Sequence, residues 1–254
     1  MFGFSSGPDI VGDGPTHRRI HEIVLWRIEE QIASGRLKVG DRLPSERDLA
    51  ASLGVGRPAV REAIRVLEAM GTVVPGAAGS DSATLVAAVP GDALTHLVTL
   101  HVMLSSFETT DVVRARIALE RESSRLAAKQ ATLADHTAMA DELVAMEHLD
   151  ITPEEFNDRD TAFHLAIARA SGNVLLTELT TALRVAMRPT QLRLLRADPD
   201  FPAIAARLAG EHHGIHDAIG SGDGDLAANR IEAHIEDFYN VFGDSGDGDS
   251  GDGD

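Results

Sequence analysis

Two short apolar repeats joined by a glycine turn, between residues 44 and 67, constrain the fold of this chain most. Ser45 precedes the first repeat, where its hydroxyl oxygen can accept the backbone N–H of Asp48 and begin a helix. Gly54 supplies a tight turn after that helix. The second repeat has helical spacing, and its inner face consists of Val60, Ala63, Ile64 and Leu67. We therefore predict a helix-turn-helix.

The outer face of the second helix is basic. Arg57, Arg61 and Arg65 point away from the apolar positions. A guanidinium offers a planar fork of donors that suits base edges and phosphates, and the N-terminal part of such a helix is the part that enters the major groove. An ordinary solvated helix face would carry the same stripe, but it would not require the cap and the glycine turn. We therefore expect double-stranded DNA as a partner.

The flanking segments extend this motif. A helix is predicted from about His17 to Ser34, ended by Gly35. Downstream, the β-prone runs Thr72–Val74 and Ala83–Val86 enclose a loop rich in Pro, Gly and Ser. Three helices and a β-wing make a winged helix-turn-helix domain, which we assign to residues 17–87.

The charge distribution fits a chain in which one domain binds DNA. The net charge is −17, which argues against nucleic acid when taken alone. Residues 17–75, however, hold ten Lys or Arg against eight Asp or Glu, whereas residues 76–254 hold 13 against 30. No apolar run is long enough to span a bilayer and no export pattern precedes the domain. We therefore expect a cytoplasmic protein with no membrane association.

The rest of the chain is predicted to be helical. Residues 91–242 contain about seven helical segments, several with clear caps such as Thr152-Pro153-Glu154-Glu155. The fold class is therefore mainly α, with an N-terminal winged helix-turn-helix and a C-terminal all-α bundle. The segments 1–16 and 243–254 are rich in Gly, Ser, Pro or Asp, and we expect a disordered arm and a disordered acidic tail.

A set of metal-ligating residues lies within the predicted bundle. Asp160 and His164 are four residues apart, so both can reach one ion from the same helix face. His212 and His234 lie on the last two helices beside apolar positions. One carboxylate and three imidazoles suit Zn²⁺, Ni²⁺, Mn²⁺ or Fe²⁺. Since the chain has 11 histidines, spacing alone leaves His213 and His216 as competing ligands.

The first predicted domain also carries a family resemblance. The segments 43–47, 54–63 and 67–71 resemble the DNA-binding domain of the GntR family of bacterial transcription regulators. The resemblance implies that Arg47, Arg57 and Arg61 contact the operator, and that a wing loop near Gly79 touches the DNA. Gly56 stands where the family usually has Ser or Thr, and the wing lacks the family's basic pattern. The operator-contacting positions implied in this way are Arg47, Gly56, Arg57, Pro58, Ala59, Arg61 and Gly79.

A second resemblance concerns residues 91–242. The segments 116–120, 160–164, 171–173 and 211–219 are similar to the effector domain of the FadR-type GntR regulators, the FCD domain. This domain binds small carboxylic acids, often through a metal. The resemblance implies that Asp160, His164, His212 and His234 hold a divalent metal ion and that Arg116 binds the effector carboxylate.

These observations predict a transcription regulator. An organic acid bound at the metal would control operator affinity, and we expect the protein to act as a repressor. The resemblance implies a homodimer, and two-fold symmetry then implies a palindromic operator. Two alternatives stay open at this stage. One is a metal-dependent enzyme using the Asp and His site, and the other is a DNA-binding protein without an effector.

Overall fold

A computed structural model describes residues 19–76, 84–87, 91–104 and 107–243 of the chain. The chain divides into two compact units, Met1–Ala93 and Leu94–Asp254, which we describe one at a time. The predicted arm at residues 1–16, the wing position Gly79 and nearly all of the predicted tail at 243–254 lie outside the described residues.

The first unit contains three helices and a hairpin. Its helices are α1 (Ile20–Ala33), α2 (Glu46–Leu53) and α3 (Arg57–Ala69). Ser45 caps α2 by accepting a hydrogen bond of 3.2 Å from the backbone N–H of Asp48, as the sequence predicts. Gly54 has φ +66°, a left-handed conformation that ends α2 and lets α3 leave in a new direction.

The hairpin contributes to the core of the first unit. Strands β1 (Val73–Pro75) and β2 (Thr84–Val86) pair antiparallel, with Val73 opposite Val86. Both of these valines are buried against the helices, whose contribution to the same core includes Val24, Ile28, Leu49, Val60, Ile64 and Leu67. Helix α3 buries the face with Val60, Ile64 and Leu67 in this core, so its opposite face is exposed to solvent.

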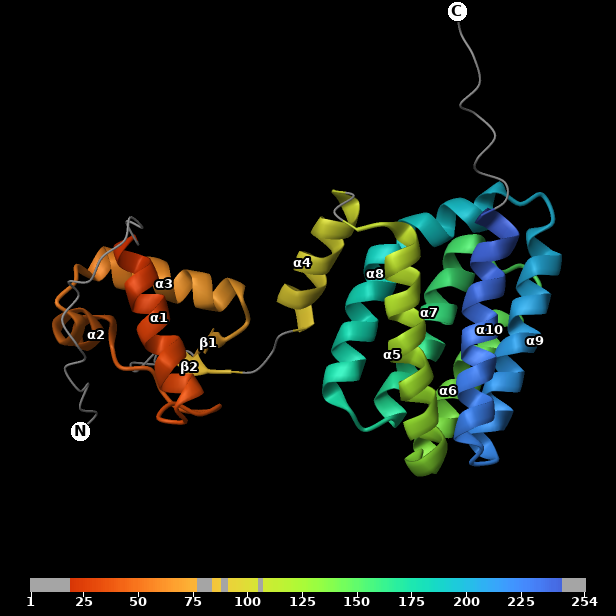
Figure 1. Cartoon of the computed structure of the whole chain (residues 1–254), viewed down its shortest axis with the longest axis horizontal. Helices are drawn as coiled ribbons and strands as arrows, with labels where there is room; N and C mark the ends of the chain where they lie inside the picture. Colours follow the sequence, from red (N-terminus) through yellow and green to blue (C-terminus); the bar gives the residue numbers. More distant parts are fainter. Residues whose placement is uncertain (1–18, 77–83, 88–90, 105–106, 244–254) are drawn as a thin grey trace, which may run out of the picture. The chain divides into compact units, whose positions relative to one another are not determined.

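The second unit is helical throughout its described residues (Figure 1). Its helices are α4 (Gly91–Met103), α5 (Thr109–Gln130), α6 (Leu133–Met146), α7 (Pro153–Ala170), α8 (Val174–Ala197), α9 (Phe201–Gly220) and α10 (Gly224–Gly243). The expected number of seven is confirmed for this part of the chain. Helix α8 continues through Pro189 and ends at Ala197.

Helix caps and packing fix where the functional side chains lie. Thr152 and Glu155 form a capping box, with Pro153 in the first turn, and this motif sets the start of α7. Helix α7 packs against α5, α6 and α8, while α10 lies side by side with α5 and α9. The core between them is apolar, and it includes Met139, Leu143, Phe156, Phe163, Leu208, Ile215, Ile231 and Ile235. The mainly α fold class, with a winged helix-turn-helix and a helical second unit, is confirmed.

Candidate nucleic-acid interface and metal centre

The outer face of α3 presents three arginines to solvent. The exposed fractions of their side chains are 61% for Arg57, 52% for Arg61 and 68% for Arg65. The first turn of the same helix is open as well, since Gly56 and Pro58 are exposed and Ala59 is half-buried. A helix that is buried on one face and basic on the other has the geometry needed to enter a DNA groove.

Glu46, the first residue of α2, holds two of these arginines. Arg61 donates to its carboxylate from Nε at 3.3 Å and from Nη2 at 3.0 Å. Nη2 of Arg57 lies 3.7 Å from the same carboxylate. The hydrogen bond from Arg61 holds the pKa of the Glu46 carboxyl below its usual value. Arg47, by contrast, is largely exposed, and its Nε lies 3.4 Å from Asp48 Oδ1.

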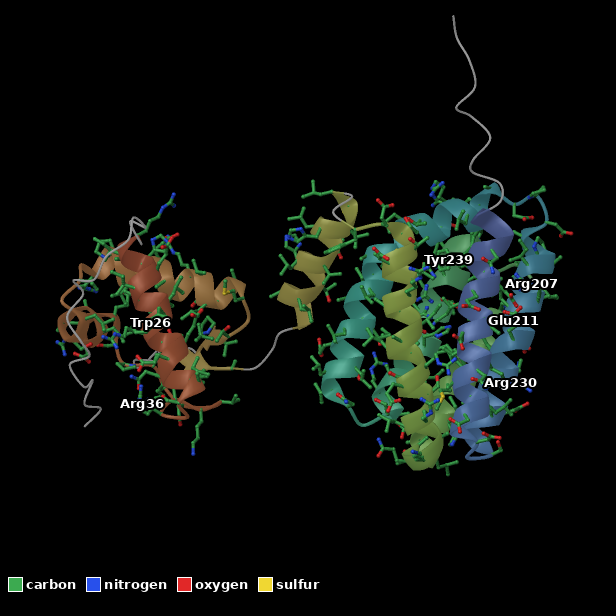
Figure 2. The ribbon with its side chains drawn as sticks, in the orientation of Figure 1. Trp26, Arg36, Arg207, Glu211, Arg230 and Tyr239 are labelled. Atoms are coloured by element: carbon green, nitrogen blue, oxygen red, sulfur yellow. The ribbon has the colours of Figure 1, made fainter. Side chains whose placement is uncertain are left out.

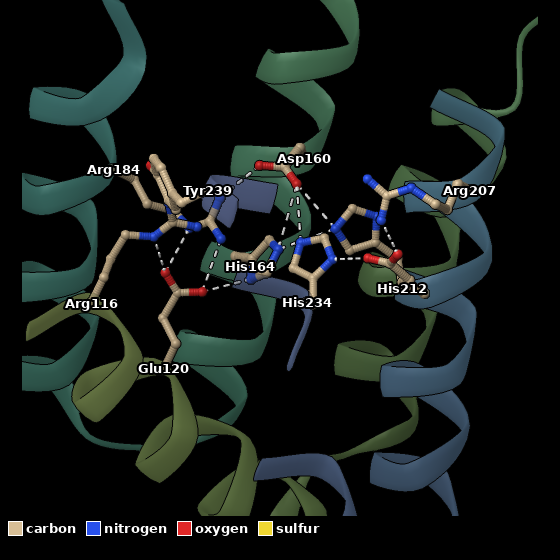
Figure 3. Close-up of polar contacts among 10 residues, drawn as sticks. Arg116, Glu120, Asp160, His164, Arg184, Arg207, His212, His234 and Tyr239 are labelled. Atoms are coloured by element: carbon tan, nitrogen blue, oxygen red, sulfur yellow. Dashed lines mark hydrogen bonds and ion pairs between the residues drawn. The ribbon is translucent and has the colours of Figure 1, made fainter. Parts of the chain in front are cut away.

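In the second unit, four buried side chains from three helices converge. They are Asp160 and His164 of α7, His212 of α9 and His234 of α10, and their potential ligand atoms all lie within 4.8 Å of one another. Asp160 Oδ1 lies 3.0, 3.5 and 4.0 Å from the Nε2 atoms of His212, His164 and His234 respectively. The structure thus brings together the four residues named from spacing and resemblance (Figure 3).

Burial keeps the three imidazoles neutral. Removal from water lowers the pKa of His164 and of His234, and it brings the pKa of His212 to about 4, with the neighbouring His234 adding to the shift. A neutral imidazole offers a lone pair, which is what a metal ligand needs.

A second layer of charged side chains surrounds these four residues. Nδ1 of His164 lies 2.6 Å from Glu120 Oε2, and Nδ1 of His234 lies 2.7 Å from Glu211 Oε2. Asp160 Oδ2 accepts a hydrogen bond of 2.7 Å from Arg184. Carboxylates behind histidines and a donor behind a carboxylate are the arrangement that orients metal ligands.

Glu120 is the centre of a buried ion network. Arg184 donates to both of its carboxylate oxygens, at 3.1 and 2.9 Å, and Arg116 Nε donates at 2.7 Å. Arg116 also donates to the hydroxyl of Tyr239 at 3.1 Å. Figure 3 shows Glu120 between the two arginines and His164, and Figure 2 shows Tyr239 and Glu211 on the neighbouring helices α10 and α9.

The two buried carboxylates of this network are ionised. Burial alone would raise the pKa of Glu120 and of Asp160, but Arg184 in both cases holds the pKa well below its usual range. Burial would likewise lower the pKa of Arg116, and Glu120 outweighs it so that this pKa is raised. Every buried charge in the network therefore has a partner of opposite sign.

A cavity adjoins the cluster of converging residues. Asp160 and His234 form part of its wall, and so do Arg116 and Tyr239. The predicted effector-binding arginine and two of the four predicted metal ligands therefore line one cavity.

The donor set fits a divalent transition-metal ion. Bonds of about 2.0 to 2.2 Å to one ion place neighbouring ligand atoms roughly 3 to 4 Å apart. The observed separations of 3.0, 3.5 and 4.0 Å from Asp160 Oδ1, and 3.2 Å between the Nε2 atoms of His164 and His212, lie in that range. Three imidazole nitrogens with one carboxylate leave coordination positions for another ligand.

The two competing histidines lie elsewhere on α9. His213 is half-buried and contacts Glu147, the residue that follows α6, at 2.8 Å. His216 faces His136 of α6, with 3.4 Å between their ring nitrogens. Neither belongs to the group of converging ligand atoms in the described part of the chain.

Sequence reasoning assigned no role to Glu46, Glu120, Arg184 or Glu211. A signal for Arg184 existed, because it lies at helical spacing with the buried residues Thr180, Met187 and Gln191. An arginine on a buried helix face needs an acidic partner. No comparable pattern marks which carboxylate supplies it.

Comparison with known families gives two matches that together cover most of the chain. Residues 21–75 match the family described as "Bacterial regulatory proteins, gntR family", and residues 111–237 match the family described as "FCD domain". The first match contains α1 to α3 and the basic face, and the second contains all four converging residues.

Individual relatives align with most of the chain. The chain is 31% identical to the HTH-type transcriptional regulator LutR of Bacillus subtilis, over 83% of this chain and 95% of that protein. It is 29% identical to a putative L-lactate dehydrogenase operon regulatory protein of Escherichia coli, over 86% of this chain and 84% of that protein. A solved structure of a Streptococcus agalactiae GntR protein matches its fold with a TM-score of 0.57 at 22% identity, covering 87% and 99% of the two chains.

No helix among the described residues is both long and apolar enough to cross a membrane.

Proposed function

This chain belongs to the gntR family of bacterial regulatory proteins and is a transcription regulator with an FCD domain, and we propose that a small carboxylic acid bound at the Asp160 metal centre controls its affinity for an operator. The proposed regulator is a homodimer that represses transcription from a palindromic site. The matched families and the relatives are transcription regulators rather than enzymes, which argues against the metal-dependent enzyme.

One observation carries the proposal about the effector. Asp160 and His234 of the cluster and Arg116 line the same cavity. A divalent ion held by Asp160 and the three histidines would supply a Lewis-acidic position for one carboxylate oxygen. Arg116 has donors beyond the Nε that it gives to Glu120, and these can reach a second oxygen of the same acid.

The relatives indicate the size of the acid. One of them is named for an L-lactate dehydrogenase operon, and lactate is a short carboxylic acid. We therefore propose an acid of a few carbon atoms.

Coupling to DNA would run through the helices that carry the ligands. Filling the cavity changes the contacts of α5, α7 and α10 at once, because Arg116, Asp160 and His234 come from those three helices. A ligand can shift operator affinity only through different affinity for the two states of the protein. Reciprocity then requires that operator DNA weaken acid binding by the same factor as the acid weakens operator binding.

The test is to measure operator binding of the full chain with its metal, in the presence and absence of short organic acids. The operator is first selected from a random duplex pool, and we expect the selected sites to be palindromic and bound at least 10³-fold more tightly than random duplex at physiological salt. An acid that binds should release the DNA. Uniform binding to all duplexes would support a DNA-binding protein without sequence preference, and tighter operator binding with the acid would contradict release of the DNA by the effector.

A further inference from the structure

Two buried amide side chains line the cavity beside the metal centre. Asn157 of α7 is 2% exposed and Gln191 of α8 is 4% exposed. The side-chain oxygens of both have no hydrogen-bond partner among the described residues. Both residues belong to the cavity wall that also contains Arg116 and Asp160.

Such a pair is unusual in a packed helical domain. Buried polar groups are nearly always hydrogen-bonded, and an unpaired one lowers the stability of the fold. The neighbouring charged residues of this domain follow that rule, since Glu120, Arg184 and Asp160 are fully paired. Two buried amides whose oxygens are unpaired and which line one cavity therefore indicate groups whose partner is a bound molecule.

We propose that these amides select the effector, and that the effector is a short acid with a hydroxyl group on a carbon beyond the one next to its carboxylate. The inference rests on the proposed function, because it takes the carboxylate end to lie at Arg116 and the metal centre. Asn157 and Gln191 then bind the hydroxyl at the other end, and each amide can both donate to it and accept from it.

The chemistry of the cavity argues against other groups at that end. A second carboxylate would be buried against two neutral amides, without the cation that a buried charge requires. An alkyl group would leave both amides unpaired, at the cost of the hydrogen bonds that a hydroxyl supplies. The carbon chain itself has apolar neighbours, because the remaining wall includes Phe156, Leu195 and Phe238.

The experiment compares acids that differ by a single hydroxyl. Calorimetric titration of the full chain, loaded with one equivalent of Zn²⁺, is carried out with glycerate and lactate, and with 2,4-dihydroxybutyrate and 2-hydroxybutyrate. All four acids keep the 2-hydroxyl, so that any role of this group at the metal cancels within each pair. We expect the acid with the additional hydroxyl to bind at least tenfold more tightly in at least one pair.

Two variants and a control assign the preference to the amides. Gln191→Met and Asn157→Leu keep the approximate size of each side chain and remove its hydrogen-bonding groups. In each variant we expect the ratio of the two affinities in the preferred pair to fall to about twofold or less. The main cause should be weaker binding of the acid with the additional hydroxyl. Thr180→Val is the control, since Thr180 is buried with an unpartnered hydroxyl but does not line the cavity, and it should leave the ratio unchanged.

The possible failures are distinguishable. Equal affinities within both pairs in the unmodified protein would overturn the inference and leave carboxylate binding intact. A ratio of affinities that persists in both variants would also overturn the inference. Failure of all four acids to bind the zinc-loaded chain would instead overturn the proposed effector site. The comparison within the unmodified protein does not depend on whether either variant folds, and zinc content with circular dichroism shows which variants do.

Discussion

Arg61 of α3 donates two hydrogen bonds to the carboxylate of Glu46 on α2, so the fork of the central arginine on the basic face is held in one orientation before any DNA is present. A fixed fork has less conformational freedom to lose when it meets a base edge. The same carboxylate, however, repels phosphate. Glu46 therefore favours binding to the operator and opposes binding to random duplex. Its role can be measured by comparing the two affinities.

Glu46→Gln should separate these two effects. Loss of a negative charge raises affinity for random duplex, whereas loss of the charged acceptor frees Arg61 and weakens readout at the operator. We expect the ratio of operator to random affinity to fall about tenfold, equivalent to ~1.4 kcal/mol. Glu62→Gln is the charge-matched control, because the carboxylate of Glu62 pairs with Arg65, at 3.8 Å, whereas that of Glu46 pairs with Arg61. It should raise both affinities together, and an equal fall in the ratio there would assign the effect to charge alone.

Replacement of the arginines tests α3 as the helix that contacts bases. Arg57→Ala and Arg61→Ala should each weaken operator binding by about 1 to 3 kcal/mol, if each makes a good base contact. Both side chains are more than half exposed, so thermal stability should change little. Unchanged operator affinity in Arg61→Ala, measured by titration of labelled duplex, would show that another surface contacts the bases.

Ile64→Ala is the contrasting substitution on the same helix. Its side chain is buried in the core of the first unit, so its truncation should lower the free energy of unfolding by about 2 to 5 kcal/mol. Chemical denaturation measures this value. Operator binding of the fraction that remains folded should be nearly normal, which distinguishes packing from contact.

The sequence predicts the first unit well because local rules decide it. A cap at Ser45, a positive-φ glycine at Gly54 and one apolar face on α3 each follow from a few neighbouring residues. Spacing alone did not choose His212 over His213 and His216, and the family resemblance implied it; in the structure His212 continues the buried stripe of Ile215 and Ile219.

The sequence did not predict the ion network around Glu120, because contacts between distant segments form it rather than local rules. Arg184 and Glu120 are 64 residues apart and meet only because α5 and α8 pack together. Helical periodicity marks each as buried, but pairing between helices is a property of the tertiary structure. The unpaired amides of Asn157 and Gln191 are likewise visible only when the cavity between helices is known.

Metal binding can be tested with two histidines that are adjacent in the sequence. If Asp160 and the three histidines form one site, elemental analysis should find about one divalent ion per chain, and His212→Ala should lose it because a ligand is missing. His213→Ala should retain it, since that side chain contacts Glu147 instead. Equal metal content in the two variants would contradict this ligand assignment.

Removal of the ion should lower thermal stability, because the site joins three helices. A ligand that binds only the folded state stabilises it by about 2.7 kcal/mol at a free concentration one hundred times its dissociation constant. We therefore expect the melting temperature to fall after chelation and dialysis, and to recover when the ion is returned. A melting temperature independent of free metal would indicate that the four side chains bind no ion at the concentrations used.

The two buried arginines should differ in what they control. Arg184 contacts Asp160 Oδ2, so Arg184→Met removes a partner of a metal ligand and should weaken metal affinity about 10- to 100-fold. Arg116 contacts Glu120 and Tyr239 rather than a ligand, and it lines the cavity. Arg116→Met should therefore keep the ion, because Arg184 still pairs with Glu120, and it should weaken binding of the acid severalfold or more. Metal content and calorimetry with the tightest-binding short acid measure the two effects separately. If Arg116→Met binds the acid as tightly as the unmodified protein, the carboxylate lies elsewhere in the cavity, and if it loses the ion as well, the network acts as one unit and assigns no separate role to Arg116.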